Sequence, residues 1–443
     1  MLTRRVILLG STGSIGTQTV EVIEHLNALA ARGQSPVQFE VVGLAAGRNA
    51  DGLVQQAGRF PRAELALADG DAGADALASA RSVLGDRVRR ARRGPAAALE
   101  LVQSVECDLV LGAMVGSSGL PATLEALRRG TDVALANKET LVAAGGLVVP
   151  VALKSGARLL PVDSEHSALW QCLVGRGPEA SGVAGVPVPP LASAPAGVAR
   201  VILTASGGPF RAWTRDRIEN ATVREALNHP TWSMGPKVTI DSASLTNKAL
   251  EVIEAHWLYA LGPREIGVLV HPQSIVHSCV EFDDGSVLAQ LGSPDMRCPI
   301  QYALTFPHRL PASCRRMDWS TARGGEGAGP AGKMARLDFE EPDHERFPAL
   351  RLAYEVIERG GVAGAVFNAA NEAAVEAFLA ERIPFGEIPR LSERALREVG
   401  GAGAGRGASG APPASLDDVL LADAEARAFV RGAIERRGAL SGL

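Results

Sequence analysis

Short apolar runs alternate with amphipathic stretches along the first 160 residues of this 443-residue chain. The apolar runs predict β-strands over 5–9, 39–45, 109–114, 132–136 and 158–162. Between them, apolar residues recur every three to four positions, which predicts helices such as 17–29 and 120–129. Strands separated by helices are typical of βαβ units, so we expect a parallel sheet covered by helices.

The pattern changes after residue 200. Strand-like VILTAS and HPQSIVHSCVEF flank a helical pattern over 246–259, and the chain after about Pro342 is mostly helical. Three Gly/Ala/Pro-rich stretches have the composition of flexible surface connections: 175–197, 321–332 and 400–415. We therefore predict an α/β N-terminal domain over 1–160, a central α+β domain over 161–310, a linker over 311–342 and a helical C-terminal domain over 343–443.

Charge indicates the class of partner, and cysteine content indicates the cellular compartment. The 45 Lys and Arg residues against 49 Asp and Glu residues argue against nucleic acid or an anionic membrane, so we expect a small-molecule ligand. Five cysteines without a C-x-x-C pair predict a reducing compartment, with neither a structural disulfide nor a zinc ribbon. We see no signal-peptide core and no bilayer-spanning run, and therefore expect a cytoplasmic protein.

The stretch GSTGSIG at residues 10–16 follows an apolar strand and opens a helix. Glycines let the backbone approach a pyrophosphate closely, and the positive end of the following helix faces its charge. A tight turn without a ligand is the alternative. GRGASG at 405–410 matches the commoner G-x-G-x-x-G form but follows no strand, so we give it no weight.

The end of the second predicted strand indicates which dinucleotide binds. It reads GLAAGRN and offers Arg48 and Asn49 where an NAD-binding fold usually has an acid. A guanidinium forms charge-assisted hydrogen bonds with a 2′-phosphate, which favours NADPH over NADH. A solvated loop charge is the other interpretation of Arg48.

Two carboxylates follow the strand over 158–162, in the sequence PVDSEH. Asp163 and Glu165 point the same way in an extended segment and would repel one another without a positive charge between them. Oxygen ligands favour Mg²⁺ or Mn²⁺ over zinc. An Asp or Ser that caps a helix would explain the motif equally well.

The segment DSASLTNKALEVIEAHW supplies a third carboxylate. Asn247 and Glu251 share one helix face, and Lys248 borders it. Hydroxyl, amide and ammonium groups at this helix start suit a phosphate. A plain Lys248–Glu251 pair on a helix surface is the simpler alternative.

Further polar residues cluster in two loops and near one strand. Ser206, in TASGGPF, opens a possible anion-binding nest. Trp232, in NHPTWSMGPK, has the setting of a lid, although a Trp more often belongs to a core. We expect His271 and His277 on one face of a strand, where they could be metal ligands. No third nitrogen or sulfur ligand accompanies them, so we favour a structural role for His271 and a substrate contact for His277.

Nine sequence blocks, in order and over about three hundred residues, resemble the 1-deoxy-D-xylulose 5-phosphate reductoisomerase family. They are GSTGSIG, AAGRN, LANKE, PVDSEH, ASGGPF, NHPTWSMG, SASLTNKALEVIEA, HPQSIVHS and LAQLGSPDMR. NAANEAAVEAFL, nearer the C-terminus, is similar to that family too. The resemblance implies a Rossmann-like NADPH-binding domain, a central catalytic domain, a C-terminal helical domain and a homodimer.

The resemblance also implies roles for individual residues. Asp163, Glu165 and Glu251 would bind one divalent cation, Mg²⁺ or Mn²⁺, with Lys138 as a further catalytic group. The implied substrate contacts are Lys138, Ser164, Glu165, Ser206, His229, Trp232, Ser242, Asn247, Lys248, Glu251 and His277. The implied cofactor contacts are Thr12, Gly13, Ser14, Ile15, Gly47, Arg48, Asn49, Asn137, Glu139 and Met296. Arg48 stands where many relatives have lysine, which keeps the charge but changes the geometry of phosphate binding.

The activity implied by the resemblance is the NADPH- and cation-dependent rearrangement and reduction of 1-deoxy-D-xylulose 5-phosphate to 2-C-methyl-D-erythritol 4-phosphate, in isoprenoid precursor synthesis. Another NADP-dependent aldehyde or hydroxy-acid oxidoreductase is the alternative. A phosphorylating semialdehyde dehydrogenase would need a nucleophilic cysteine at a strand end, and no cysteine lies in such a block. A non-catalytic NADPH sensor would bind the cofactor without turnover.

Overall fold

The computed structural model describes residues 1–69, 84–174, 187–232, 234–317, 336–402, 413 and 415–441. The Gly/Ala/Pro-rich stretch at 321–332 lies outside the described residues, as do most of 175–197 and 400–415 and the GRGASG match at 405–410.

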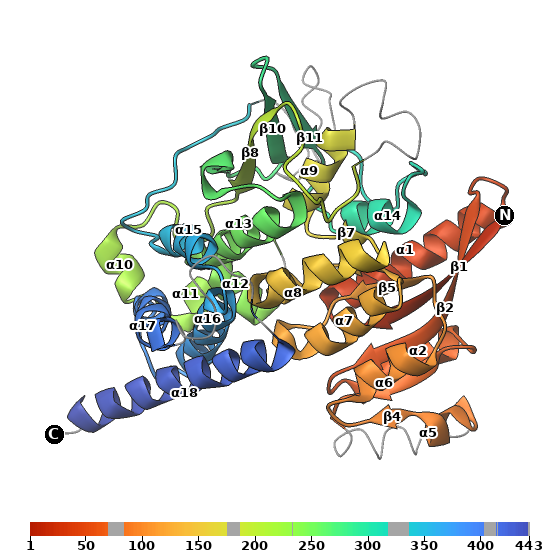
Figure 1. Cartoon of the computed structure of the whole chain (residues 1–443), viewed down its shortest axis with the longest axis horizontal. Helices are drawn as coiled ribbons and strands as arrows, with labels where there is room; N and C mark the ends of the chain where they lie inside the picture. Colours follow the sequence, from red (N-terminus) through yellow and green to blue (C-terminus); the bar gives the residue numbers. More distant parts are fainter. Residues whose placement is uncertain are drawn as a thin grey trace.

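A seven-stranded parallel sheet forms the N-terminal part of the chain, in the order β4-β3-β2-β1-β5-β6-β7 (Figure 1). Its strands are β1 (Leu2–Leu9), β2 (Val37–Ala46), β3 (Glu64–Leu67), β4 (Arg92–Arg93), β5 (Leu109–Gly112), β6 (Asp132–Leu135) and β7 (Leu159–Pro161). The five predicted strands are confirmed, and β3 and β4 add two short ones. The order reverses beside β1, and ligands of such sheets bind at the carboxyl ends of the strands near this reversal.

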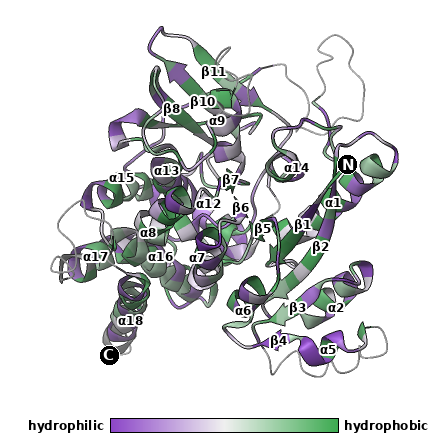
Figure 2. Ribbon diagram, turned by 45° about the vertical axis from the view of Figure 1, so that its right-hand side comes forward, coloured by the Kyte–Doolittle hydropathy of each residue, from purple (hydrophilic) through white to green (hydrophobic). Residues whose placement is uncertain are grey.

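Helices connect these strands and cover the sheet. They are α1 (Ser14–Ala31), α2 (Ala50–Arg59), α5 (Arg87–Arg90), α6 (Ala97–Ser104), α7 (Leu120–Arg128) and α8 (Glu139–Ser155). Figure 2 shows hydrophobic residues concentrated in β1 and β2 and hydrophilic residues along α5. All four residues of β5 are buried, so both faces of the sheet are shielded there, as expected for parallel strands.

A second, four-stranded sheet has the order β11-β10-β8-β9. Its strands are β8 (Val198–Ala205), β9 (Ile266–Val270), β10 (Val276–Phe282) and β11 (Val287–Leu291). β8 pairs with β9 in parallel and with β10 antiparallel, which confirms a mixed α+β region. The helices of this region are α9 (Ser164–Val174), α10 (Arg215–Glu219), α11 (Val223–Ala226), α12 (Pro236–Ala243), α13 (Thr246–Tyr259) and α14 (Arg297–Thr305).

The C-terminal part is helical, as predicted. It consists of α15 (Ala349–Arg359), α16 (Ala363–Leu379), α17 (Glu387–Ala402) and α18 (Leu416–Ser441). Helix α16 packs against α17, α18, α12 and also α8, so the C-terminal helices contact both preceding parts of the chain.

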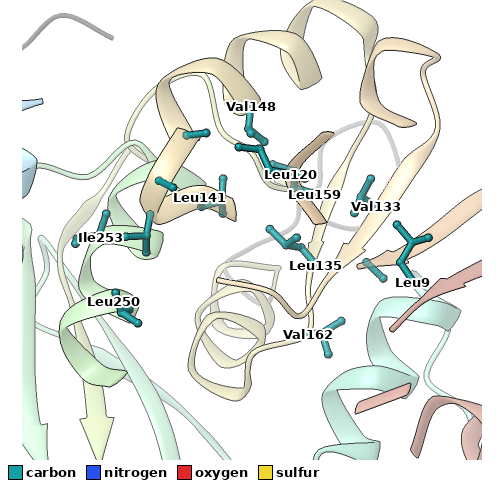
Figure 3. Close-up of a cluster of buried hydrophobic side chains, with 14 of the residues drawn as sticks. Leu9, Leu120, Val133, Leu135, Leu141, Val148, Leu159, Val162, Leu250 and Ile253 are labelled. Carbon is teal, nitrogen blue, oxygen red and sulfur yellow. The ribbon is translucent and has the colours of Figure 1, made fainter. Parts of the chain in front are cut away.

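One cluster of buried side chains joins the parallel sheet to the central region (Figure 3). Leu141 and Val148 of α8 belong to it, as do Leu250 and Ile253 of α13. Each of these side chains is at most 1% exposed, and burial of a Leu, Val or Ile side chain contributes roughly 1.5–3 kcal/mol. The cluster fixes the amino end of α8 relative to α13, and both helices reach the site described below.

The expectation of no structural disulfide is wrong, because Cys298 and Cys314 form one. Cys298 lies in the first turn of α14, and the chain folds back along that helix after its end. Gln301 stabilises this reversal, since its Nε2 donates hydrogen bonds to the carbonyls of Leu310 and Pro311 at 3.0 and 3.2 Å. The other three cysteines are free thiols.

Among the described residues, no helix is both long enough and apolar enough to cross a bilayer.

Candidate functional site

A cleft of about 220 Å³ lies at the carboxyl ends of the N-terminal strands, facing the second sheet. Its walls come from the residues that follow β1, β6, β7 and β8 and from α12, α13, β10 and the start of α14. The lining includes these predicted site residues: Ser14, Ile15, Lys138, Asp163, Ser164, Glu165, Ser206, Trp232, Ser242, Asn247, Lys248, Glu251, His277 and Met296. Segments as far apart in sequence as Ser14 and Met296 thus meet in one place.

Three carboxylates gather at the base of this cleft. Asp163 and Glu165 stand at the start of α9, and Glu251 projects from α13. One oxygen of each lies within 4.8 Å of the other two. The predicted acidic triad is therefore one cluster.

Two lysines neutralise part of this charge. Lys138 Nζ lies 2.5 Å from Asp163 Oδ2 and 2.7 Å from Glu251 Oε1. Lys248 Nζ lies 2.7 Å from Glu165 Oε1 and also pairs with Glu251. The simpler alternative of a Lys248–Glu251 pair is thus correct as far as it goes, but the pair is buried inside the cluster and does not lie on a solvated surface.

The two acids at the start of α9 have opposite pKa shifts. Burial raises the pKa of Glu165 to about 8, and the nearby charge of Glu251 raises it further against the effect of Lys248. Burial alone would also raise the pKa of Asp163, but the ammonium of Lys138 holds it well below its usual range. Too few positive charges therefore lie near Glu165 to keep all three acids ionised.

The donor set fits a hard divalent cation. Three carboxylates face two ammonium groups, and an additional positive charge would allow Glu165 to ionise. Every candidate ligand atom is oxygen, which Mg²⁺ and Mn²⁺ prefer. A second group, Asp163 with His166 and Glu254, is less suited to a cation that contacts the substrate, because His166 and Glu254 do not line the cleft.

Two serine hydroxyls line the same cleft as the carboxylates. His229 Nε2 is 3.1 Å from both Ser206 Oγ and Ser242 Oγ. His229 Nδ1 accepts a hydrogen bond from the backbone N–H of Trp232 at 2.9 Å, so the ring proton is on Nε2. Burial lowers the pKa of His229 to about 4, which keeps the ring neutral. His229 thus links the two serines to the loop that carries Trp232.

The GSTGSIG loop has the geometry of a phosphate-binding turn. Gly10 has a left-handed φ of +81°, and a Cβ on Gly16 would lie 2.3 Å from the carbonyl oxygen of Gly10. Helix α1 begins at Ser14, so its free N–H groups face the cleft that Ser14 and Ile15 line. Thr12 and Gly13 belong to the same turn, and Met296, at the start of α14, also lines the cleft.

Gly47, Arg48 and Asn49 follow β2 and do not line the cleft. The Arg48 side chain is 89% exposed, with Nε 3.5 Å from Asp69 Oδ2. Asn49 caps α2, since its Oδ1 accepts a hydrogen bond from Gly52 N at 2.9 Å. Arg48 is therefore accessible to a ligand that extends from the GSTGSIG loop past the end of β2.

Two predicted cofactor contacts are occupied by the protein itself. Asn137 Nδ2 donates to the carbonyl of Gly116 at 2.9 Å, and its Oδ1 accepts from Thr140 N. Glu139 is 6% exposed and pairs with Lys237 at 2.7 Å. The structure places both side chains behind the cleft wall.

The two histidines near β10 differ from the expectation in one respect. They do not share a strand, because β10 begins at Val276 and His271 lies in the preceding turn. Both ring nitrogens of His271 face backbone groups, with Nε2 3.1 Å from Ile275 N and Nδ1 2.8 Å from the carbonyl of Asp338. The expected structural role of His271 agrees with this geometry, and His277 lines the cleft.

Some lining residues were missed by sequence reasoning. Ser274 lines the cleft in a left-handed conformation (φ +52°), and its buried Oγ has no hydrogen-bond partner among the described residues. The block HPQSIVHS contains Ser274, so attention to its serine, and not only its histidines, would have found it. Gln18 and Val238 carried no comparable signal.

Three family models match the chain in succession. They are described as 1-deoxy-D-xylulose 5-phosphate reductoisomerase (residues 6–145), the C-terminal domain of that enzyme (residues 159–259) and DXP reductoisomerase C-terminal domain (residues 291–429). The 1-deoxy-D-xylulose 5-phosphate reductoisomerase of Chloroherpeton thalassium is 46% identical over 428 residues, which cover 96% of this chain and 97% of the relative.

Solved structures agree with the sequence comparison. A DOX-P reductoisomerase crystallised with NADPH, fosmidomycin and magnesium has a TM-score of 0.82 at 34% identity, with 98% of each chain covered. The 1-deoxy-D-xylulose 5-phosphate reductoisomerase of Zymomonas mobilis, in complex with NADPH, has a TM-score of 0.78 at 37% identity, with 98% of this chain and 99% of that chain covered.

Proposed function

The chain belongs to the 1-deoxy-D-xylulose 5-phosphate reductoisomerase family, and from this premise we propose which of its residues carry the reaction. The protein is an NADPH-dependent oxidoreductase that converts 1-deoxy-D-xylulose 5-phosphate to 2-C-methyl-D-erythritol 4-phosphate with the help of a divalent cation. The alternative of another NADP-dependent oxidoreductase finds no support. No cysteine lines the described cleft, so a phosphorylating semialdehyde dehydrogenase lacks its nucleophile.

Asp163, Glu165 and Glu251 are the proposed cation ligands. Their clustered oxygens, one from each residue and all within 4.8 Å of one another, are the single observation that carries this assignment. A cation bound there supplies a Lewis acid for the substrate oxygens next to the bond that breaks. Lys138 adds a fixed positive charge on the same side of the cleft.

The substrate phosphate is proposed to bind Ser206, Ser242, Asn247 and Lys248. His229 donates its Nε2 proton toward either serine and holds Trp232 N through Nδ1. Phosphate binding therefore orders the loop that carries Trp232, which excludes water from the cleft. Ser164 and His277 complete the proposed substrate contacts.

NADPH is proposed to place its pyrophosphate on the loop of Thr12, Gly13, Ser14 and Ile15. Its nicotinamide then lies against Met296 in the cleft, within reach of the substrate. The 2′-phosphate meets Arg48, near Gly47 and Asn49, beyond the end of β2. The cleft thus brings hydride donor and cation to the same substrate.

Consumption of NADPH with 1-deoxy-D-xylulose 5-phosphate tests this assignment. The purified protein should oxidise NADPH only when both the sugar phosphate and Mg²⁺ or Mn²⁺ are present, and should form 2-C-methyl-D-erythritol 4-phosphate. NADPH binding without turnover in the complete mixture would favour a cofactor-sensing protein instead.

A homodimer is proposed from the edge of the second sheet. Strand β11 is an edge strand, with Val287 52% and Leu288 40% exposed. An exposed apolar edge strand is a site for pairing with another chain. Light scattering after size exclusion should give twice the chain mass, and Val287→Lys with Leu288→Lys should give the monomer. A wild-type monomer at micromolar concentration would exclude this proposal.

A cytoplasmic location is proposed because the reaction consumes NADPH. The Cys298–Cys314 disulfide is the feature that points the other way, since disulfides are rare in reducing compartments. Cell fractionation decides between a cytoplasmic location and one outside the reducing cytoplasm. The protein should accompany a cytoplasmic marker, and its recovery in the envelope or the medium would contradict the proposal.

A further inference from the structure

A chain of buried ion pairs lies behind the cleft wall, outside the groups assigned to cation and substrate. Lys237 Nζ lies 2.7 Å from Glu139 Oε1 and 3.0 Å from Asp241 Oδ2. The side chains of these three residues are 17%, 8% and 1% exposed, respectively. Asn371 Nδ2 donates a hydrogen bond to the other oxygen of Asp241 at 2.8 Å.

The members of this chain come from three separate parts of the fold. Glu139 is the first residue of α8 and directly follows Lys138. Lys237 and Asp241 lie one turn apart on α12, and Asn371 lies on α16 among the C-terminal helices. The contacts therefore join the helix that positions Lys138, the short helix α12 and the C-terminal region.

Helix α12 has functional groups of the cleft at both ends. Trp232, Met234 and Gly235 line the cleft just before it begins, and Gly235 is its N-cap. Ser242 directly follows Asp241 at the other end. A shift of α12 relative to α8 would therefore move two things together: the start of the loop that carries Trp232, and the Ser242 hydroxyl that is proposed to bind the phosphate.

The charges of this network remain in place despite burial. Burial alone would lower the pKa of Lys237, but Asp241 and Glu139 raise it above its usual value. Burial alone would raise the pKa of Glu139, but Lys237 lowers it. Buried ion pairs contribute little net stability in general and are retained in some proteins because they fix one arrangement of the chain.

We propose that Lys237 is a positioning residue, which holds Glu139 and Asp241 together and thereby sets the Trp232 loop and Ser242 against Lys138. The proposal rests on the proposed function, since it assigns Ser242 to the phosphate and Lys138 to the reacting end of the substrate. Lys237 does not line the cleft and acts through its two partners.

The experiment compares a charge-free network with the wild type. The variant combines Lys237→Met, Glu139→Gln and Asp241→Asn, so that no buried charge is left without a partner. Lys154→Met is the matched control, because Lys154 is an exposed lysine on α8. We expect kcat to fall at least tenfold and KM for the sugar phosphate to rise. We expect KM for NADPH to change less than twofold, and the control to match the wild type.

Fluorescence supplies a readout that a merely structural role would not move. The change in emission that the sugar phosphate causes in the wild type, and that Trp232→Phe abolishes, reports the Trp232 loop. In the charge-free variant this change should need at least tenfold more sugar phosphate. If the variant does not fold, Asn371→Ala replaces it, with at least a threefold loss of kcat/KM expected.

Each result has a definite meaning. Unchanged kcat/KM in a folded variant overturns the proposal, and so does an effect confined to KM for NADPH, which would assign Glu139 to the cofactor. A lower melting temperature with wild-type kinetics below it also overturns the proposal, because the network would then be structural only. An inactive wild type would count against the proposed function. The fluorescence comparison would then still test whether Lys237 positions the loop that carries Trp232.

Discussion

Lys138 Nζ lies 2.7 Å from Glu251 Oε1, although the two residues are 113 positions apart in sequence. Lys138 follows β6 of the parallel sheet, and Glu251 lies on α13 of the central region. The pair therefore stands where the proposed cofactor half of the site meets the proposed cation half. It couples the two halves through a buried charge pair, which is sensitive to the loss of either partner.

Glu251→Gln should lower kcat on the order of a hundredfold, because it removes one proposed cation ligand and its charge while preserving shape. Steady-state NADPH oxidation at saturating Mg²⁺ measures the loss. Glu106→Gln is the control, since the Glu106 side chain is 81% exposed and far from the cleft. Near-normal turnover of Glu251→Gln would remove this residue from the site.

Cation binding should be visible without any turnover. A ligand that binds only the folded state stabilises it in proportion to the logarithm of its concentration over Kd. Mg²⁺ should therefore raise the melting temperature of the wild type after treatment with a chelator, and should have no such effect on Asp163→Asn. The same shift in both proteins would mean that Mg²⁺ binds elsewhere.

Arg48→Ala should raise KM for NADPH about tenfold or more and leave KM for NADH nearly unchanged. A hydrogen bond to a charged group contributes about 1.5–3 kcal/mol, and only NADPH carries the 2′-phosphate. Arg32→Ala is a suitable control, because Arg32 is exposed and lies beyond the far end of α1. Equal effects on the two cofactors would return Arg48 to the role of a surface charge.

The N-terminal fold was predictable because its pattern is local. Strands such as Leu109–Gly112 are uninterrupted apolar runs flanked by amphipathic helices, which is what burial between two helical layers requires. Strand β3 has four residues and β4 two, and Arg92–Arg93 carries no apolar signal at all. Such short strands, of which β4 lies at the edge of the sheet, depend on their neighbours and not on their own sequence.

The site was predictable where its residues adjoin a strand end or share a helix face. Asp163 and Glu165 follow β7, and Asn247 and Glu251 share one face of α13, so spacing alone placed each pair. The Glu139–Lys237 pair joins residues 98 positions apart, and neither lies in a pattern that names the other. Contacts of this kind arise from tertiary packing. They leave no local pattern in a single sequence, so they cannot be predicted from it.

The disulfide should be detectable by counting thiols. The denatured protein should release three thiols to a thiol reagent without reduction and five after reduction, since Cys298 and Cys314 are joined. The cysteines are 16 residues apart, and a disulfide that closes a 15-residue loop contributes about 3 kcal/mol by the loop-entropy estimate. Cys298→Ser with Cys314→Ser should accordingly unfold at a lower denaturant concentration. Five thiols before reduction would show that the bond does not form.

His277 should make the folded protein sensitive to mild acid. Burial lowers the pKa of His277 to about 4, with a further contribution from Lys248, whereas an unfolded chain has a pKa near 6.5. The unfolded state therefore takes up the proton first as pH falls, and stability is lost between about pH 6.5 and pH 4. At pH 5 this loss amounts to about 2 kcal/mol. Denaturant unfolding at pH 7.5 and pH 5 measures it.

His277→Gln isolates this contribution from other acid-sensitive groups. The variant lacks the titrating ring, so its free energy of unfolding should fall less between the two pH values than that of the wild type. His344→Gln is the control for the substitution itself, because His344 lies on the surface. The sign follows from burial: a depressed pKa means that the fold holds the ring neutral, and protonation must then favour the unfolded chain. Equal losses in wild type and His277→Gln would show that the ring accepts its proton in the cleft without cost.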